Sequence, residues 1–147
     1  MPVTTDPAQL LLEHTRSRAH PQCVVCSQSD PCGLGLRFSL CKDGSVEANF
    51  TCRDCLQGYA GILHGGITSA LLDGAMTNCL FAHGVVALTG RMTVRFRHPV
   101  QLATSVLVRG RIVRSEPPLH MLRAEVLQDG QVMASAESKF MQTAGKP

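Results

Sequence analysis

The chain has 147 residues, of which 44% are hydrophobic and 17% are charged, and its net charge is +3. This composition excludes a disordered chain, and the length predicts one domain with a sizeable core. The weak charge and the aromatic content of 4% argue against nucleic-acid partners. Because the sequence shows neither a run of about 18 apolar residues nor a signal-peptide pattern, we expect a cytoplasmic protein without membrane contact.

The first predicted elements are a short helix and a hairpin. Asp6 and Pro7 are typical of a helix start, with Gln9 completing a capping box, and the helix should run to about Arg18. A loop rich in Pro, Cys and Ser follows over residues 19–33. The strands LGLRFSLCK and SVEANFTC are joined by an Asp-Gly pair, which predicts a tight turn.

The second half of the chain predicts one buried helix and four strands. The helix, from about Gly66 to Ala82, is apolar on nearly every side. We expect the strands to form a meander within residues 86–98, 105–114, 119–128 and 131–142. These elements indicate an α+β fold, with one curled antiparallel sheet wrapped round the helix. Such a sheet leaves a face or an edge uncovered, so a homodimer is expected.

The predicted helix carries one narrow polar stripe. Ser69, Asp73 and Thr77 recur at every fourth position and therefore share one face. A carboxylate buried without partners has a raised pKa or serves a dedicated site. The alternative is that the stripe faces solvent or a subunit interface and that Asp73 is an ordinary solvated acid.

His64, Gly65 and Gly66 stand where this helix begins. Unpaired N–H groups and the positive end of the helix dipole attract a carbonyl oxygen or an oxyanion there. Glycine lets a ligand approach the backbone closely. Asp73 lies about two turns further along. Donors and a carboxylate on one helix suit acyl transfer, in which the N–H polarises a carbonyl while the carboxylate attacks it or activates water. Taken alone, the His-Gly-Gly triplet is equally typical of an ordinary helix entry.

Two segments, GYAGILHGGITSALLDGAMTNCLFAHG and ALTGRMTVRFRHPV, resemble the hotdog-fold thioesterase superfamily, in particular its PaaI-like (phenylacetic-acid-degradation type) branch. The segment CVVCSQSDPCGLGLRF resembles the entry that many of these proteins have before their first strand, so the resemblance spans residues 20–142. It implies a hydrolase of acyl-CoA thioesters with active sites at the interface of a homodimer or a homotetramer. CoA would be part of the substrate, and no cofactor would be required for catalysis.

The resemblance also implies roles for particular residues. Asp73 would be the nucleophile or general base, and Gly65, with Gly66, would supply the oxyanion N–H. His64 would shape that loop, and Thr77 would position water.

Three further positions take their roles from the same resemblance. Thr89 falls where related enzymes carry a Ser or Thr that assists from the partner subunit. Many relatives have Asn or Gln about six residues before the His. Gly58 stands there in this chain, and the adjacent Gln57 takes that role if the loop shifts by one residue. The side chains expected to line the acyl site are Ile62, Leu63, Met76 and Leu80.

Arginines are abundant between Asp73 and Glu116, a stretch with no acidic residue. The six are Arg91, Arg95, Arg97, Arg109, Arg111 and Arg114. Such a surplus, Arg91 included, suits the phosphates of CoA. The alternative is that these side chains form the solvent faces of amphipathic strands.

The seven cysteines include two CxxC pairs. These are Cys23 with Cys26 and Cys52 with Cys55. Pairing of the first two strands would bring both pairs to one end of the sheet, where they suit a structural zinc ion. Cys32 and His20 are nearby substitutes. Alternatively, the second pair is a chance occurrence, since we expect no metal in relatives that share the first.

The expected domain plan is an N-terminal helix and extension over residues 1–21, the hotdog domain over 22–143 and a tail over 144–147. The favoured function is hydrolysis of a small, medium-chain or aryl acyl-CoA. A non-catalytic hotdog protein that binds acyl-CoA or an acyl carrier is the main alternative. A hotdog hydratase or dehydratase, which needs a His acid/base paired with a carboxylate, fits least well because His64 precedes Asp73 by two turns.

Overall fold

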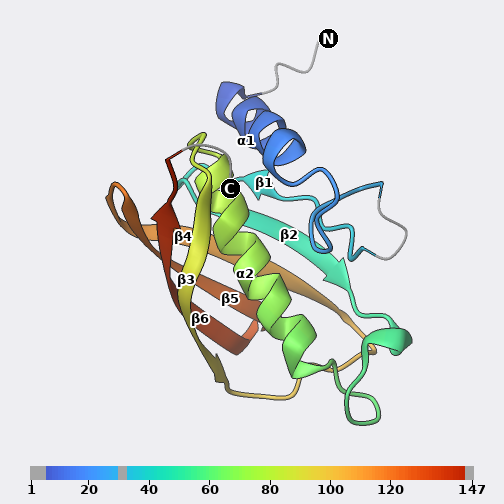
Figure 1. Cartoon of the computed structure of the whole chain (residues 1–147). Coiled ribbons are helices and arrows are strands. Elements are labelled where there is room, and N and C mark those ends of the chain that lie inside the picture. Colours follow the sequence, from blue (N-terminus) through green and yellow to red (C-terminus); the bar gives the residue numbers. More distant parts are fainter. Residues whose placement is uncertain (1–5, 30–32, 145–147) are drawn as a thin grey trace.

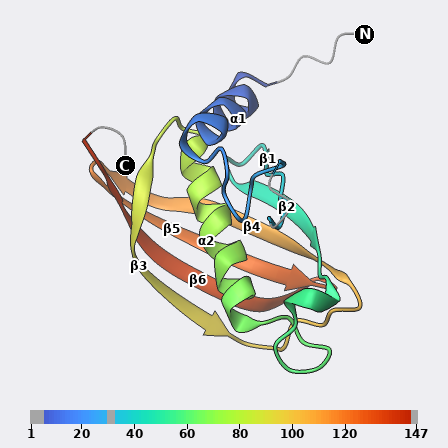
Figure 2. The same cartoon turned by 45° about the vertical axis from the view of Figure 1, so that its right-hand side comes forward.

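The computed structural model describes residues 6–29 and 33–144. A curled six-stranded antiparallel sheet wraps round the long helix α2, and α1 packs near the C-terminal end of α2 (Figures 1 and 2). The expected α+β architecture is therefore confirmed. The elements are α1 (Pro7–Ala19), β1 (Ser39–Leu40), β2 (Val46–Thr51), the 3-10 helix η1 (Asp54–Leu56), α2 (Gly65–Phe81), β3 (Ala87–Phe96), β4 (Ser105–Glu116), β5 (Leu119–Gln128) and β6 (Gln131–Gln142).

Helix α1 begins as predicted but lacks the expected capping box. The Asp6 carboxylate accepts the N–H of Ala8 at 2.9 Å, and Pro7 is the first helical residue. Gln9 does not close the box, because its Oε1 accepts the N–H of Leu40 at 2.7 Å. The side chain thus satisfies a backbone donor of the edge strand β1 and ties α1 to the sheet.

The two Asp-Gly hairpins form where predicted. Gly44 has a φ of 85° between β1 and β2, which pair antiparallel. Asp129 and Gly130, with φ of 51° and 78°, both adopt the left-handed conformation that a tight turn between β5 and β6 requires. Strand β1 is much shorter than predicted, since only Ser39–Leu40 of its segment pairs regularly.

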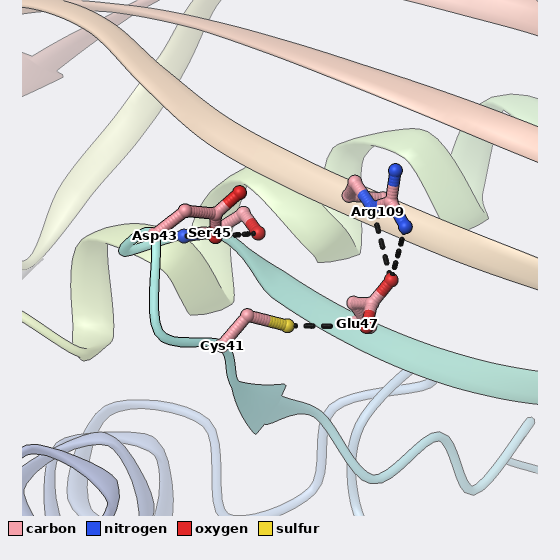
Figure 3. A network of polar contacts seen from close by, with 5 residues as sticks. All are labelled: Cys41, Asp43, Ser45, Glu47 and Arg109. Carbon is pink, nitrogen blue, oxygen red and sulfur yellow. Dashed lines mark hydrogen bonds and ion pairs between the residues drawn. The ribbon is translucent and has the colours of Figure 1, made fainter.

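A polar network holds the first hairpin to β4 (Figure 3). The Asp43 carboxylate accepts the Ser45 N–H at 3.0 Å, and the Cys41 thiol donates to Glu47 Oε1 at 3.1 Å. Arg109 donates to Glu47 Oε2 through Nε at 2.9 Å and through Nη2 at 2.6 Å. The guanidinium of Arg109 beside Glu47 lowers the pKa of that carboxyl. This arginine is therefore already paired within the sheet.

The strand order corrects the predicted meander. The order is β1-β2-β4-β5-β6-β3, so β3 pairs with β6 at one edge and β4 pairs with β2. The connection over residues 97–104 is too long for a tight turn. It passes the ends of β6 and β5 to join the edge strand β3 to β4 (Figure 2), and Ile62, just before α2, pairs with Gln101 of this connection. Strand β3 is therefore an edge strand beside α2.

The core lies between α2 and the sheet. A Cβ added to Gly110 of β4 would lie 2.7 Å from the carbonyl oxygen of Ala75, so strand and helix backbones touch there. Leu12 of α1 and Phe140 of β6 are buried in the same core, and full burial of such side chains stabilises a fold by roughly 1.5–3 kcal/mol each. Neither helix of the described residues is long and apolar enough to cross a membrane.

Candidate active site

The start of α2 is built round His64. This residue is the N-cap, and its Nδ1 accepts the N–H of Gly66 at 2.8 Å. The first N–H groups of a helix have no acceptor within the helix, and His64 satisfies one of them. The Gly66 N–H is therefore engaged, and Gly65 is the glycine of the pair that lines the adjacent cavity. Of the two glycines predicted to supply the oxyanion donor, Gly65 is thus the one whose N–H is not taken up by His64.

A cavity of about 680 Å³ opens beside this helix start, within the range of ordinary ligand sites. Of the predicted acyl-site residues, Ile62 and Leu63 line it. Phe96 also lines it, 57% exposed, with its ring 3.6 Å from the place a Cβ on Gly65 would take. The sequence reasoning missed Phe96, although its alternation with Met92 and Val94 along β3 placed it on this face.

Gly58 and Gln57, the two positions considered for the Asn or Gln of the relatives, lie differently in the loop before His64. Gly58 lines the cavity, and a Cβ added to it would lie 3.3 Å from Cδ2 of His64. Gln57 is exposed, and its Oε1 accepts the N–H of Gly61 at 3.1 Å. The side-chain amide oxygen of Gln57 thus stabilises its own loop, while Gly58, which packs closely against His64, forms part of the cavity wall.

Asp73 lies half-buried on the open side of α2. Thr89 Oγ1 donates a hydrogen bond to Asp73 Oδ1 at 2.7 Å. Burial raises the pKa of the Asp73 carboxyl, and the Thr89 hydrogen bond acts in the opposite direction because it favours the charged form. The resemblance implied that Thr89 assists from a partner subunit, whereas the structure shows it bonded to Asp73 of its own chain.

The remaining predicted site residues on α2 lie away from the cavity. Thr77 is buried one turn after Asp73. Met76, expected to line the acyl site, is completely buried in the core, because its position on the helix faces the sheet, and it does not line the cavity. Leu80 is likewise a core residue at the other end of the helix.

Three of the six arginines, Arg97, Arg109 and Arg111, line one depression on the sheet together with Arg123, and the other three do not line it. Arg91, predicted to contact substrate, lies with Thr93 and Arg123 in a depression on the outer face of the sheet. Arg109 is paired with Glu47, and Arg114 is paired with Glu116. The arginine that does line the main cavity is Arg97, which lies just beyond the end of β3. No motif distinguished it from its neighbours in the sequence.

The predicted oxyanion donor and the predicted carboxylate are far apart within one chain. Gly65 and Asp73 are eight residues apart on the same helix, or about 12 Å along its axis. Neither Asp73 nor Thr89 lines the cavity of Gly65. Reacting atoms must approach to about 3–3.5 Å, so the two groups of a single chain do not meet at one carbonyl.

The cysteine pairs also lie differently from the prediction. Among the described residues, Cys23 and Cys26 gather with His20, all three ligand atoms lying within 4.8 Å of one another. Cys52, which is buried, and Cys55, which is exposed, do not belong to this group. The expected four-cysteine cluster is therefore not brought together, and Cys32 lies outside the described residues.

The pKa values of the two thiols in this group are shifted in opposite directions. A hydrogen bond from the Cys26 thiol lowers the pKa of Cys23 to about 3, and the same bond raises the pKa of Cys26. The N–H groups of Val25 and Cys26 also donate to Cys23 Sγ. The donors round Cys23 Sγ thus favour the charged form of that thiol.

Comparisons with known proteins agree with this architecture. A curated relative, the acyl-coenzyme A thioesterase THEM4 of Bos taurus, is 28% identical over 87 residues, which are 57% of this chain and 35% of that protein. The chain thus spans about a third of the length of that relative. A phenylacetic acid degradation-related protein from Ralstonia eutropha has a solved structure that is 26% identical, with a TM-score of 0.67 over 74% of this chain and 85% of that chain.

A second solved structure, from Streptococcus mutans and bound to acetyl CoA, is 21% identical. Its TM-score is 0.69 over 76% of this chain and 91% of that chain, so the hotdog fold is confirmed. The sequence model of the thioesterase superfamily matches residues 60–135, from the loop before His64 into β6. The chain therefore belongs to the thioesterase superfamily.

Proposed function

We propose that the chain is an acyl-CoA thioesterase that works as a homodimer, with Gly65 of one protomer and Asp73 of the other at each active site. The observation that carries this proposal is the separation of about 12 Å between the two groups along α2. Two antiparallel copies of the helix, related by a two-fold axis, would bring each donor opposite the other copy's carboxylate. One carbonyl would then be within reach of both.

The open side of the molecule suits such pairing. Strand β3 is an edge of the sheet, and the exposed side chains beside it include Leu88 (52% exposed) and Phe96 (57% exposed). The half of α2 that carries Gly65 and Asp73 is exposed or half-buried along the same side. Pairing two β3 edges would cover unpaired backbone groups and this apolar surface together.

The chemistry follows from the two groups. The thioester carbonyl would lie in the cavity with its oxygen facing the Gly65 N–H, which stabilises the negative charge that develops there. Asp73 would attack the carbonyl carbon, or take a proton from the water that attacks it. If Asp73 attacks, the carbon–sulfur bond breaks as an anhydride forms with the carboxylate, and water then hydrolyses this anhydride to the free acid and restores Asp73. If water attacks, the carbon–sulfur bond breaks to give the free acid directly. In both routes the departing CoA sulfur takes up a proton, so the products are a free acid and CoA. No cofactor is required.

The apolar lining of the cavity suits a substrate with a small, medium-chain or aryl acyl group. Ile62, Leu63 and Phe96 supply its apolar surface, and Arg97 stands at its margin. The names of the relatives, an acyl-coenzyme A thioesterase and a protein that binds acetyl CoA, support CoA over other thiols. If the protein only binds acyl-CoA, the ligand will occupy the cavity without release of thiol.

Two substitutions at Gly65 test the donor. Gly65→Pro removes the N–H while suiting the first turn of a helix, and we expect thiol release from acyl-CoA to fall by about 10²–10³-fold. Gly65→Ala is the matched control, since it keeps the N–H and its Cβ meets Phe96 at an ordinary 3.6 Å. Equal activity of the two variants would remove Gly65 from the mechanism.

Mixing two inactive variants tests the shared site. Asp73→Asn and Gly65→Pro protomers, allowed to exchange, form mixed dimers in which one site has both intact groups. Recovery of about a quarter of the wild-type activity is expected, because half of randomly paired dimers are mixed and each has one complete site. Absence of recovery, with exchange verified by mass, would refute the shared site while leaving the thioesterase activity itself in place.

A further inference from the structure

The loop between α1 and β1 gathers three metal-binding side chains. His20 Nδ1 lies 3.8 Å from Cys26 Sγ, and the ligand atoms of His20, Cys23 and Cys26 all lie within 4.8 Å of one another. In a tetrahedral zinc site, with Zn–S near 2.3 Å and Zn–N near 2.0 Å, neighbouring ligand atoms are roughly 3.5–3.8 Å apart. The distance between His20 Nδ1 and Cys26 Sγ therefore matches this spacing, and the other two distances exceed it by no more than about 1 Å.

The backbone of the loop is folded round the first sulfur. The N–H groups of Val25 and Cys26 point to Cys23 Sγ, at 3.3 Å and 3.5 Å. Hydrogen bonds of this kind orient metal ligands and favour the thiolate that a metal binds. Arg16 donates to the carbonyl oxygen of Cys26 at 3.3 Å, and its positive charge acts on the Cys26 thiol.

The same loop is pressed against α2 at the turn that carries Asp73. A Cβ added to Gly74 would lie 2.5 Å from Cγ1 of Val25, so the loop contacts the helix backbone next to Asp73. The ring of His20 packs edge-on against Phe81, with centroids 5.0 Å apart. An ion held by this loop would therefore fix its position on the helix.

We propose that His20, Cys23 and Cys26 bind one zinc ion, which clamps the loop of residues 20–26 onto α2 beside Asp73. One imidazole and two thiolates form a donor set that suits zinc in a tetrahedral geometry. The fourth position is left to a water molecule. The ion's role is to stabilise this contact, so its presence is measurable whether or not the protein hydrolyses thioesters.

Metal analysis of the full chain tests the proposal. The protein is purified under reducing conditions without chelator, then supplied with zinc and freed of excess by gel filtration. About one zinc ion per chain is expected, and its removal by a chelator should lower Tm, since metal-binding free energy contributes to folding. Iron or copper in place of zinc would overturn the assignment, as would a zinc-free protein whose cysteines all titrate as thiols.

Variants identify the ligands. Cys23→Ser and His20→Asn, both at half-buried positions, should lose the zinc and the chelator-dependent change in Tm, with the far-ultraviolet circular dichroism unchanged. Cys41→Ser and Cys55→Ser are the controls and should keep one zinc ion. Loss of zinc from Cys55→Ser would instead support the four-cysteine site predicted from the sequence and would refute the site proposed here.

The spectrum of cobalt in place of zinc supplies a count of the sulfur ligands. Charge-transfer absorption from thiolate to cobalt grows with the number of sulfur ligands, and the visible bands report tetrahedral geometry. Two thiolates are expected, so an intensity typical of four would contradict the proposal. This measurement does not require the variants to fold.

Discussion

The two halves of α2 have similar apolar side chains but opposite surroundings. From Gly65 to Asp73 one side of the helix is open, whereas every residue from Gly74 to Phe81 is buried. The second half is covered by β4 and by the loop that carries Val25. The first half faces the edge strand β3, which pairs with β6 on one side and with no strand of the described residues on the other. Sheet topology, and not hydropathy, thus decides which half is available for chemistry.

This contrast predicts two kinds of effect. Substitutions in the first half of α2 should lower turnover, whereas substitutions at residues that pack against the second half should lower the free energy of unfolding. The largest effect is expected for Asp73→Asn, which keeps the side-chain shape but removes the charge. Loss of a general base typically lowers the rate by 10²–10⁴-fold, measured as thiol release from a panel of short, medium, long and aryl acyl-CoAs. Wild-type activity in this variant would show that the open half of α2 contributes no carboxylate to the reaction.

The opposite behaviour is expected where β4 touches the second half of the helix. Gly110→Ala would place a Cβ 2.7 Å from the carbonyl oxygen of Ala75, and backbone atoms yield little. Overpacking of this kind costs about 1–3 kcal/mol of the free energy of unfolding, measured by urea denaturation. In the folded fraction the turnover per active site should be unchanged. Gly44→Ala, in an exposed turn, is not a suitable control, because the φ of 85° at Gly44 would add backbone strain to the variant.

A matched control exists at a glycine of the open half. Gly65→Ala adds the same methyl group, which meets only Phe96 at 3.6 Å, and should leave the free energy of unfolding nearly unchanged. If Gly65→Ala and Gly110→Ala destabilise the protein equally, the difference between the two halves does not arise from packing.

The comparison also shows how far the sequence could predict the molecule. The apolar helix, the Asp-Gly turns and the bounds of β5 and β6 follow from local patterns that the structure keeps. The place of β3 beside β6 is a long-range pairing, which no local pattern encodes. The same limit applies to the site. The motif identified Asp73, Gly65 and their spacing along the helix, but the use of the Gly66 N–H by His64 and the hydrogen bond from Thr89 to Asp73 emerge only in three dimensions.

Asp73 should also destabilise the fold in a pH-dependent way. Burial raises the pKa of its carboxyl in the folded state, so the folded protein is most stabilised below the unfolded pKa and loses this contribution as pH rises through the folded pKa. Asp73→Asn should therefore have a higher Tm than the wild type at neutral pH, with the difference disappearing in acid. A difference that is constant over pH would mean that ionisation of Asp73 does not contribute.

The smallest expected effect comes from the hydrogen bond between Thr89 and Asp73. Because the Thr89 hydroxyl donates to the carboxylate at 2.7 Å, it favours the charged form and lowers the pKa that burial raises. Thr89→Val removes the donor at similar size, so the pKa of Asp73 should rise further and the acidic limb of kcat/KM should move to higher pH. Thr89→Ser keeps the hydroxyl and should keep the wild-type profile. A uniform fall in kcat/KM at all pH values would instead mean that Thr89 contacts the substrate, whereas a shift confined to the acidic limb identifies it as the residue that keeps Asp73 ionised in the open half of α2.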